Sequence, residues 1–139
     1  MRLLPTPKLR AYFDDYKEFH RTRGNAICHY IGIPLIMLTL LGLLGPIGGG
    51  ALLALAIAWY LTLDWKIALP FATYGIGLLL LSTQIGPIHL WFGFILGWIF
   101  QFVGHGIYEK KSPAFLKNIK HVLIGPLWVF AKWTFYEKA

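Results

Sequence analysis

The chain has 139 residues, of which 57% are hydrophobic, and a formal net charge of +7. A mean hydropathy of +0.59 is too high for an ordinary soluble domain, and the length suits about one domain. The basic residues lie at the two ends of the chain, on either side of a long apolar middle. This distribution argues against nucleic acid as a partner and favours membrane lipids. We therefore predict one all-α integral membrane domain over residues 1–139.

Residues 6–23 are predicted to form an N-terminal amphipathic helix. Thr6 and Pro7 suit the N-cap and the first helical position, and apolar side chains then recur at helical spacing as far as His20. Gly24 is expected to break this helix. We expect the helix to lie in the membrane interface or to cover the cytosolic end of the bundle.

The apolar middle predicts four transmembrane helices, at residues 25–44, 50–63, 67–82 and 88–105, because a bilayer core takes about 20 apolar residues per helix. Gly45, Pro46 and the glycines at 48–50 predict a turn between the first two. Gly93 and Gly97 in the fourth are spaced for close helix packing.

Residues 113–136 are predicted to form interfacial or re-entrant helices. Ser112 and Pro113 resemble a helix start, and Gly125 with Pro126 is expected to interrupt that helix. The aromatic residues that follow are typical of a membrane interface. About 12 apolar residues are short for a crossing, so a fifth transmembrane helix is the weaker alternative.

The basic residues also predict the orientation. Six precede the first predicted transmembrane helix, six follow the fourth, and Lys66 lies between the second and third. Positive charge favours the cytosolic side. Both termini and the turn at 64–66 are therefore predicted to be cytosolic, in a bacterial inner membrane or the endoplasmic reticulum. The oligomeric state stays open.

This topology brings four of the five histidines to the cytosolic side: His20, His29, His105 and His121. His89 falls at the opposite end of the fourth predicted transmembrane helix, about 24 Å from His105 along the axis. Four imidazoles at one rim predict a metal site with nitrogen and oxygen ligands, which suits iron, zinc, copper or manganese. The single cysteine, Cys28, excludes a cysteine-rich site.

Three polar residues are predicted to support the histidines. Asn25 precedes His29 by four residues, and Gln101 and Glu109 precede and follow His105 by four, so each shares a helix face with its histidine. An amide inside an apolar run, such as that of Gln101, needs hydrogen-bond partners. The alternative for Glu109 is an exposed carboxylate paired with a lysine.

Two end segments and His121 carry a resemblance to a known family. The first is His20-x4-Asn25-x3-His29-x2-Gly32-x-Pro34, the second is Gln101-x2-Gly104-His105-x3-Glu109-Lys110-x2-Pro113-Ala114, and His121 is followed by Gly125-Pro126. This pattern resembles the iron-dependent 2-hydroxy fatty acid dioxygenases. The resemblance implies alpha-oxidation, in which a 2-hydroxy fatty acid and O2 give the fatty acid that is one carbon shorter. It also implies that His20, His29, His105 and His121 are the catalytic ligands of Fe(2+).

The residues alone leave other functions open. A zinc-dependent membrane lipid hydrolase would use similar ligands. A non-catalytic metal or proton transporter would place its histidines along a path, but the predicted transmembrane interiors lack further acidic or histidine residues. A purely structural membrane protein is the remaining alternative. Among these, the metal-dependent oxygenase is our main prediction.

Overall fold

A computed structural model describes residues 3–113, 116 and 118–134. The predicted all-α fold is confirmed for this part of the chain. The helices in chain order are α1 (Pro7–Lys17), α2 (Arg23–Leu63), α3 (Trp65–Ser82), α4 (Pro87–Val103), the π-helix η1 (Gly104–Glu109) and α5 (Lys120–Trp133).

Helix α1 is the predicted N-terminal helix, but it is shorter than expected. Thr6 caps it by accepting a hydrogen bond from the backbone of Leu9 at 3.2 Å. The helix ends at Lys17 instead of continuing to residue 23. Thr22 is the N-cap of α2, so Gly24 lies inside the next helix and does not break the first. Residues 18–22 therefore form the connection, and His20 lies within it.

Helix α2 has 41 residues but bends sharply at Gly45, where φ is 75° and ψ is 174°. This left-handed φ favours glycine, and Pro46 supplies no amide hydrogen to continue the preceding helix. The helix resumes at once, so residues 48–50 are helical and the predicted extension of the turn through them is wrong. We refer to residues 23–44 as the first arm of α2 and to residues 46–63 as the second arm.

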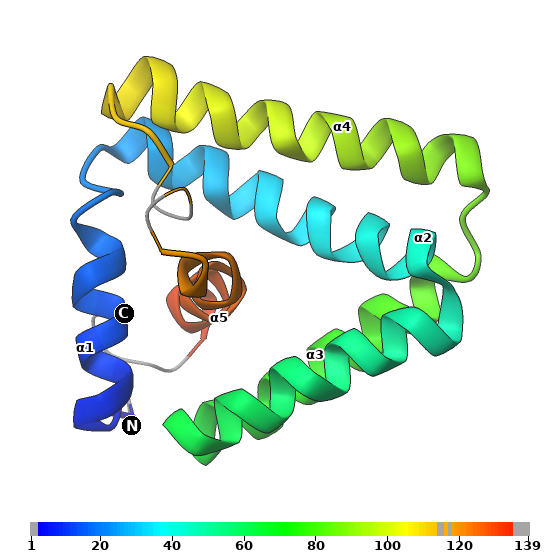
Figure 1. The fold of residues 1–139 in the computed structure, drawn as a ribbon, viewed down its shortest axis with the longest axis horizontal. Coiled ribbons are helices and arrows are strands. Elements are labelled where there is room, and N and C mark those ends of the chain that lie inside the picture. Colours follow the sequence, from blue (N-terminus) through cyan, green and yellow to red (C-terminus); the bar gives the residue numbers. More distant parts are fainter. Residues whose placement is uncertain (1–2, 114–115, 117, 135–139) are drawn as a thin grey trace.

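The helices form two layers that diverge like a V (Figure 1). The first arm of α2 packs on α4, and the second arm packs on α3. In the first layer, a Cβ added to Gly97 would lie 2.6 Å from Ile36, and one added to Gly93 would lie 2.8 Å from Thr39. The predicted close packing through Gly93 and Gly97 is therefore confirmed. Helix α1 crosses the open side of the V, and α5 lies inside it (Figure 1).

Three helical segments among the described residues are long and apolar enough to cross a membrane: Arg23–Leu63, Trp65–Ser82 and Pro87–Glu109. If α2 were straight, its 41 residues would extend about 60 Å, about twice the thickness of a bilayer core. The bend at Gly45 instead folds α2 back on itself (Figure 1).

Helix α5 differs most from expectation. It begins at Lys120, not at Ser112 and Pro113, and it continues through Pro126 without interruption. Trp128 and Phe130, expected among interfacial side chains, are only 2% and 9% exposed. They pack in the interior because α5 fills the V. The predicted helical residues 135–136 lie outside the described part of the chain.

Candidate metal centre

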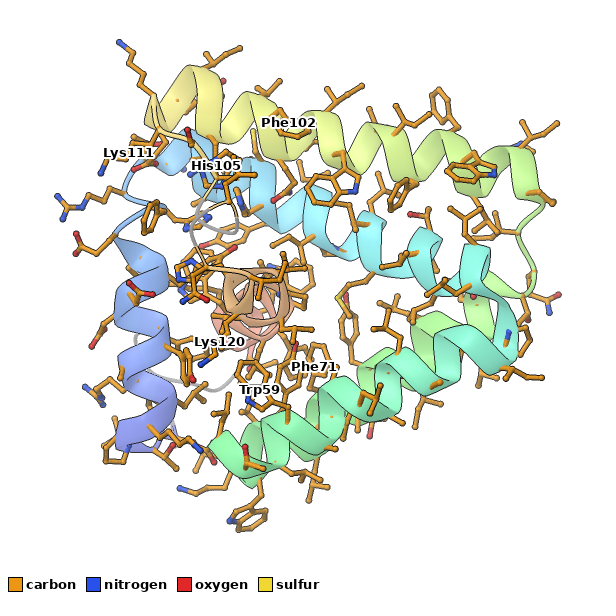
Figure 2. The ribbon with its side chains drawn as sticks, viewed as in Figure 1. Trp59, Phe71, Phe102, His105, Lys111 and Lys120 are labelled. Atoms are coloured by element: carbon orange, nitrogen blue, oxygen red, sulfur yellow. The ribbon has the colours of Figure 1, made fainter. Side chains whose placement is uncertain are left out.

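Three histidines from separate segments meet at the open side of the V. His20 lies in the connection after α1, His29 lies near the start of α2, and His105 lies in η1. In Figure 2, His105 points from η1 toward the start of α2. One ring nitrogen from each of the three lies within 4.8 Å of the others, and all three side chains are buried. This is the separation and burial that a shared metal ion requires.

The backbone determines which ring nitrogens of His20 and His29 are available. Nδ1 of His20 lies 2.6 Å from the carbonyl oxygen of Tyr16, and Nδ1 of His29 lies 2.9 Å from that of Asn25. A carbonyl oxygen only accepts, so each Nδ1 carries the proton and each neutral ring keeps a lone pair on Nε2.

The two Nε2 atoms are 3.0 Å apart. Two lone pairs at this distance repel each other unless a proton or a cation lies between them. A metal-bound histidine commonly donates its other ring N–H to a carbonyl group, as both rings do here. The donor set therefore fits a metal cation that accepts nitrogen ligands.

His105 is positioned by a local change of helix type. Helix α4 gives way to η1 at Gly104, and the carbonyl group of His105 accepts hydrogen bonds from the backbone of Lys110 and Lys111. Lys110 ends the segment with a left-handed φ of 54°. Single-turn π-helices frequently occur at functional sites, because the extra residue redirects side chains. The expected α-helical stacking of residues 101, 105 and 109 therefore stops at Gly104.

Glu109 contacts the connection that carries His20. Its carboxylate accepts hydrogen bonds from the backbone of Arg21 at 2.8 Å and of Thr22 at 3.0 Å. It also accepts from the Thr22 hydroxyl at 2.9 Å and from the Asn25 amide at 3.2 Å. The lysine-paired alternative for Glu109 has no support among the described ion pairs. Glu109 thus joins η1 to the connection and to the start of α2, so it links the three segments that carry His105, His20 and His29.

Asn25 and Gln101 both lie close to the histidines, but their contacts differ. Asn25 orients His29 with its backbone oxygen, while its side-chain amide also donates to the carbonyl oxygen of Phe19 at 3.0 Å. Gln101 lines the same cavity as the histidines. Its buried Nε2 has no hydrogen-bond partner among the described residues. Gln101 therefore offers a free donor inside the site.

His121 lies apart from the group of three. Its Nε2 is 2.6 Å from a carboxylate oxygen of Asp15, and its ring centroid is 5.5 Å from that of Tyr16. Its buried Nδ1 has no hydrogen-bond partner in the described part of the chain. The structure therefore brings three of the four predicted histidines into one group and places His121 beside it.

Sequence reasoning gave neither Asp15 nor Tyr16 a part in the candidate site. Tyr16 stacks on His20 with ring centroids 3.9 Å apart. Asp15 lies 106 positions before His121 in the sequence, so no local pattern could have paired them. Amphipathic spacing did mark Tyr16 as an inward-facing residue of α1.

A cavity of about 80 Å³ lies between the histidines and apolar side chains. It is lined by His20, His29, His105 and His121, by Gln101 and Tyr16, and by Ile33, Ile36, Met37, Trp98, Val122, Gly125 and Pro126. Such a site presents metal ligands to one end of an amphiphilic molecule and apolar contacts to the rest.

Burial of His20 predicts acid sensitivity of the metal-free protein. Desolvation, together with the nearby His29, lowers the pKa of His20 far below its usual value. Below about pH 6.5 the unfolded chain binds a proton that the folded protein does not, so stability falls as the pH is lowered. For this one group the slope is at most about 1.4 kcal/mol per pH unit. Thermal unfolding of the metal-free protein between about pH 7.5 and 5 measures this slope of stability against pH. A His20→Gln variant should show a smaller slope. Equal slopes for the two proteins would contradict a lowered pKa of His20.

Comparison with known proteins relates the chain to one family of dioxygenases. The chain matches the family described as 2-hydroxy-palmitic acid dioxygenase Mpo1-like over residues 6–136. It is 30% identical to 2-hydroxy-palmitic acid dioxygenase MPO1 of Saccharomyces cerevisiae over 147 aligned positions, covering 91% of this chain and 80% of the yeast protein. No solved structure matches significantly.

Proposed function

Because the chain belongs to the 2-hydroxy-palmitic acid dioxygenase Mpo1-like family, we propose that it is an Fe(II)-dependent dioxygenase that shortens 2-hydroxy fatty acids by one carbon. The observation that carries the proposal is the pair of Nε2 lone pairs of His20 and His29, 3.0 Å apart beside His105. A neutral, all-nitrogen donor set of this kind accepts ferrous iron.

The proposed conversion balances with O2 as the sole oxidant. R–CH(OH)–COOH and O2 give R–COOH, CO2 and H2O, so the bond between C1 and C2 breaks and C2 becomes the new carboxyl carbon. The substrate gives up four electrons, and O2 accepts four. Ferrous iron, when bound, supplies the activation of O2 that this oxidation needs.

The protein residues bind and orient the reactants. His20, His29 and His105 would hold the metal, with their tautomers set by the carbonyl groups of Tyr16 and Asn25 for the first two. His121 is proposed as the fourth ligand through Nδ1, with Asp15 orienting its ring. X-ray absorption at the iron edge would count the imidazoles, and a count of three would remove His121 from the set.

Two lysines line a cleft through which the polar end of the substrate could reach the histidines. An open cleft of about 390 Å³ lies on the outer side of His105 and is lined in part by Lys110 and Lys111. The positive charges of these two side chains favour a carboxylate by charge attraction, and Nζ of Lys111 also donates to the carbonyl oxygen of Glu18 at 3.5 Å. We infer that these lysines draw the substrate carboxylate toward the histidines. If so, replacing both with glutamine should raise KM more than it lowers kcat; an unchanged KM would contradict this role.

We also propose four membrane crossings, in which each arm of α2 crosses once. The proposal follows from the bend at Gly45 and from the return of the chain at Asp64. The distribution of basic residues supports a cytosolic position for both termini. Cysteine-accessibility labelling at Ile47, which is 90% exposed beside the bend, would test this orientation: labelling from the cytosolic side would contradict it.

The test of function is a defined reconstitution. The full chain is purified without oxygen, loaded with Fe(II), and given O2 and 2-hydroxypalmitate labelled with ¹³C at C1. We expect labelled CO2 and unlabelled pentadecanoate in equal amounts. Activity with zinc alone, or release of the label in any product other than CO2, would overturn the proposal.

A further inference from the structure

A second cavity lies deeper in the V, and none of the histidines lines it. It has a volume of about 190 Å³ and is lined by side chains from both arms of α2, from α3 and from α5. Leu53, Ala56 and Tyr60 from the second arm form part of its far wall. Phe71 contributes from α3 and points toward α5 (Figure 2). We call this space the inner chamber.

The inner chamber adjoins the histidine cavity directly. The two share four lining residues: Ile36 and Met37 from the first arm of α2, and Val122 and Pro126 from α5. Met37 is the most adaptable of these, because its unbranched side chain rotates about three bonds. A molecule whose polar end contacts His20, His29 and His105 therefore has an apolar space within reach of its other end.

The chamber offers almost no hydrogen bonding. Its lining side chains are aliphatic or aromatic apart from the thioether of Met37, and the hydroxyl of Tyr60 already donates to the carbonyl oxygen of Leu123. Water needs two to four polar partners to be stable in such a space, so an apolar occupant suits it better.

We propose that the inner chamber holds the acyl tail of the 2-hydroxy fatty acid and that Ala56 limits the length of tail it accepts; this rests on the proposed function. Leu53, Ala56 and Tyr60 follow one face of the second arm at helical spacing. Ala56 has the smallest side chain of the three. A larger side chain there would fill the chamber from its far wall without touching the histidines.

The experiment compares two substrates and two variants of the full chain in lipid nanodiscs. Ala56→Phe places a ring in the chamber, and Ala58→Phe places the same ring on an exposed position of the same helix. We expect Ala56→Phe to lower the ratio of kcat/KM for 2-hydroxypalmitate over 2-hydroxyoctanoate about tenfold or more, which corresponds to excluding about two methylenes. Ala58→Phe should leave the ratio within about twofold, the scatter of a neutral surface change. Bound iron, measured per protein, reports whether each variant keeps its site.

A direct measurement covers the case in which Ala56→Phe does not fold. 2-Hydroxypalmitate with a diazirine at its methyl end is photolysed in the unaltered protein, and labelled peptides are identified by mass spectrometry. Labelling in the second arm near Ala56 that unlabelled 2-hydroxypalmitate competes away supports the proposal. Labelling only at lipid-facing positions, or labelling without competition as expected of a bilayer lipid, would overturn it.

Failure of the two proposals can be told apart. An iron-loaded, unaltered protein that converts neither substrate refutes the proposed function, while the diazirine probe still tests the chamber. A protein that converts both substrates, but whose chain-length ratio is unchanged by Ala56→Phe, refutes the chamber as the tail site and leaves the proposed function intact.

Discussion

Replacement of His29 with alanine is expected to remove bound iron and to lower turnover of 2-hydroxypalmitate at least about 100-fold. The Nε2 atom of His29 faces that of His20 at 3.0 Å, and its ring centroid lies 4.8 Å from that of His105. Loss of this ring takes away one of three clustered nitrogen donors, and alanine provides no ligand atom in its place. Iron content after anaerobic loading and the rate of ¹³CO2 release measure the two effects.

The fifth histidine provides the matched control. His89 is exposed near the start of α4, at the end of that helix opposite His105. His89→Ala should retain full iron content and turnover, since it removes an imidazole of the same chemistry from outside the site. Normal iron binding by His29→Ala, or equal losses in the two variants, would show that the histidine group does not hold the metal.

Hydropathy and turn residues predicted most of the fold. Apolar runs of helical length can be recognised in one dimension, and the bend at Gly45 was visible because glycine followed by proline disfavours a straight helix. The helical glycines at 48–50 and the uninterrupted passage of α5 through Pro126 were not predicted. Packing of α5 inside the V, and of Gly49 against Leu79 of α3, stabilises these segments against their weak intrinsic helix propensity, and that packing is tertiary information.

The sequence predicted the histidines of the candidate site but not their orientation. The predicted membrane sidedness separated His89 from the others, because that prediction depends on position along the chain. The orienting contacts are backbone carbonyl groups of Tyr16 and Asn25, which every residue type possesses and no sequence pattern marks. The pairing of Asp15 with His121, and the π-helical turn that redirects Glu109, likewise depend on the folded geometry.

Replacement of Glu109 with glutamine is expected to weaken iron binding about tenfold or more and to lower stability by about 2 kcal/mol. One Glu109 oxygen accepts hydrogen bonds from the Thr22 backbone, the Thr22 hydroxyl and the Asn25 amide. The other accepts from the Arg21 backbone. Glutamine keeps the shape but replaces one acceptor with an NH2 group that faces a donor. The connection that carries His20 should then loosen relative to η1.

The loss of charge adds to this effect, because the Glu109 carboxylate also acts electrostatically on His29 and His105 and would offset part of the charge of a bound dication. Glu18→Gln is the matched control: Glu18 lies beside the same connection, but its carboxylate is exposed and pairs with the Arg21 side chain, a contact worth at most about 1 kcal/mol. Iron titration and thermal unfolding of the two variants separate the roles. If Glu109→Gln bound iron as tightly as Glu18→Gln, the histidine group would be held together by helix packing alone, and Glu109 would be a surface cap without a part in the site.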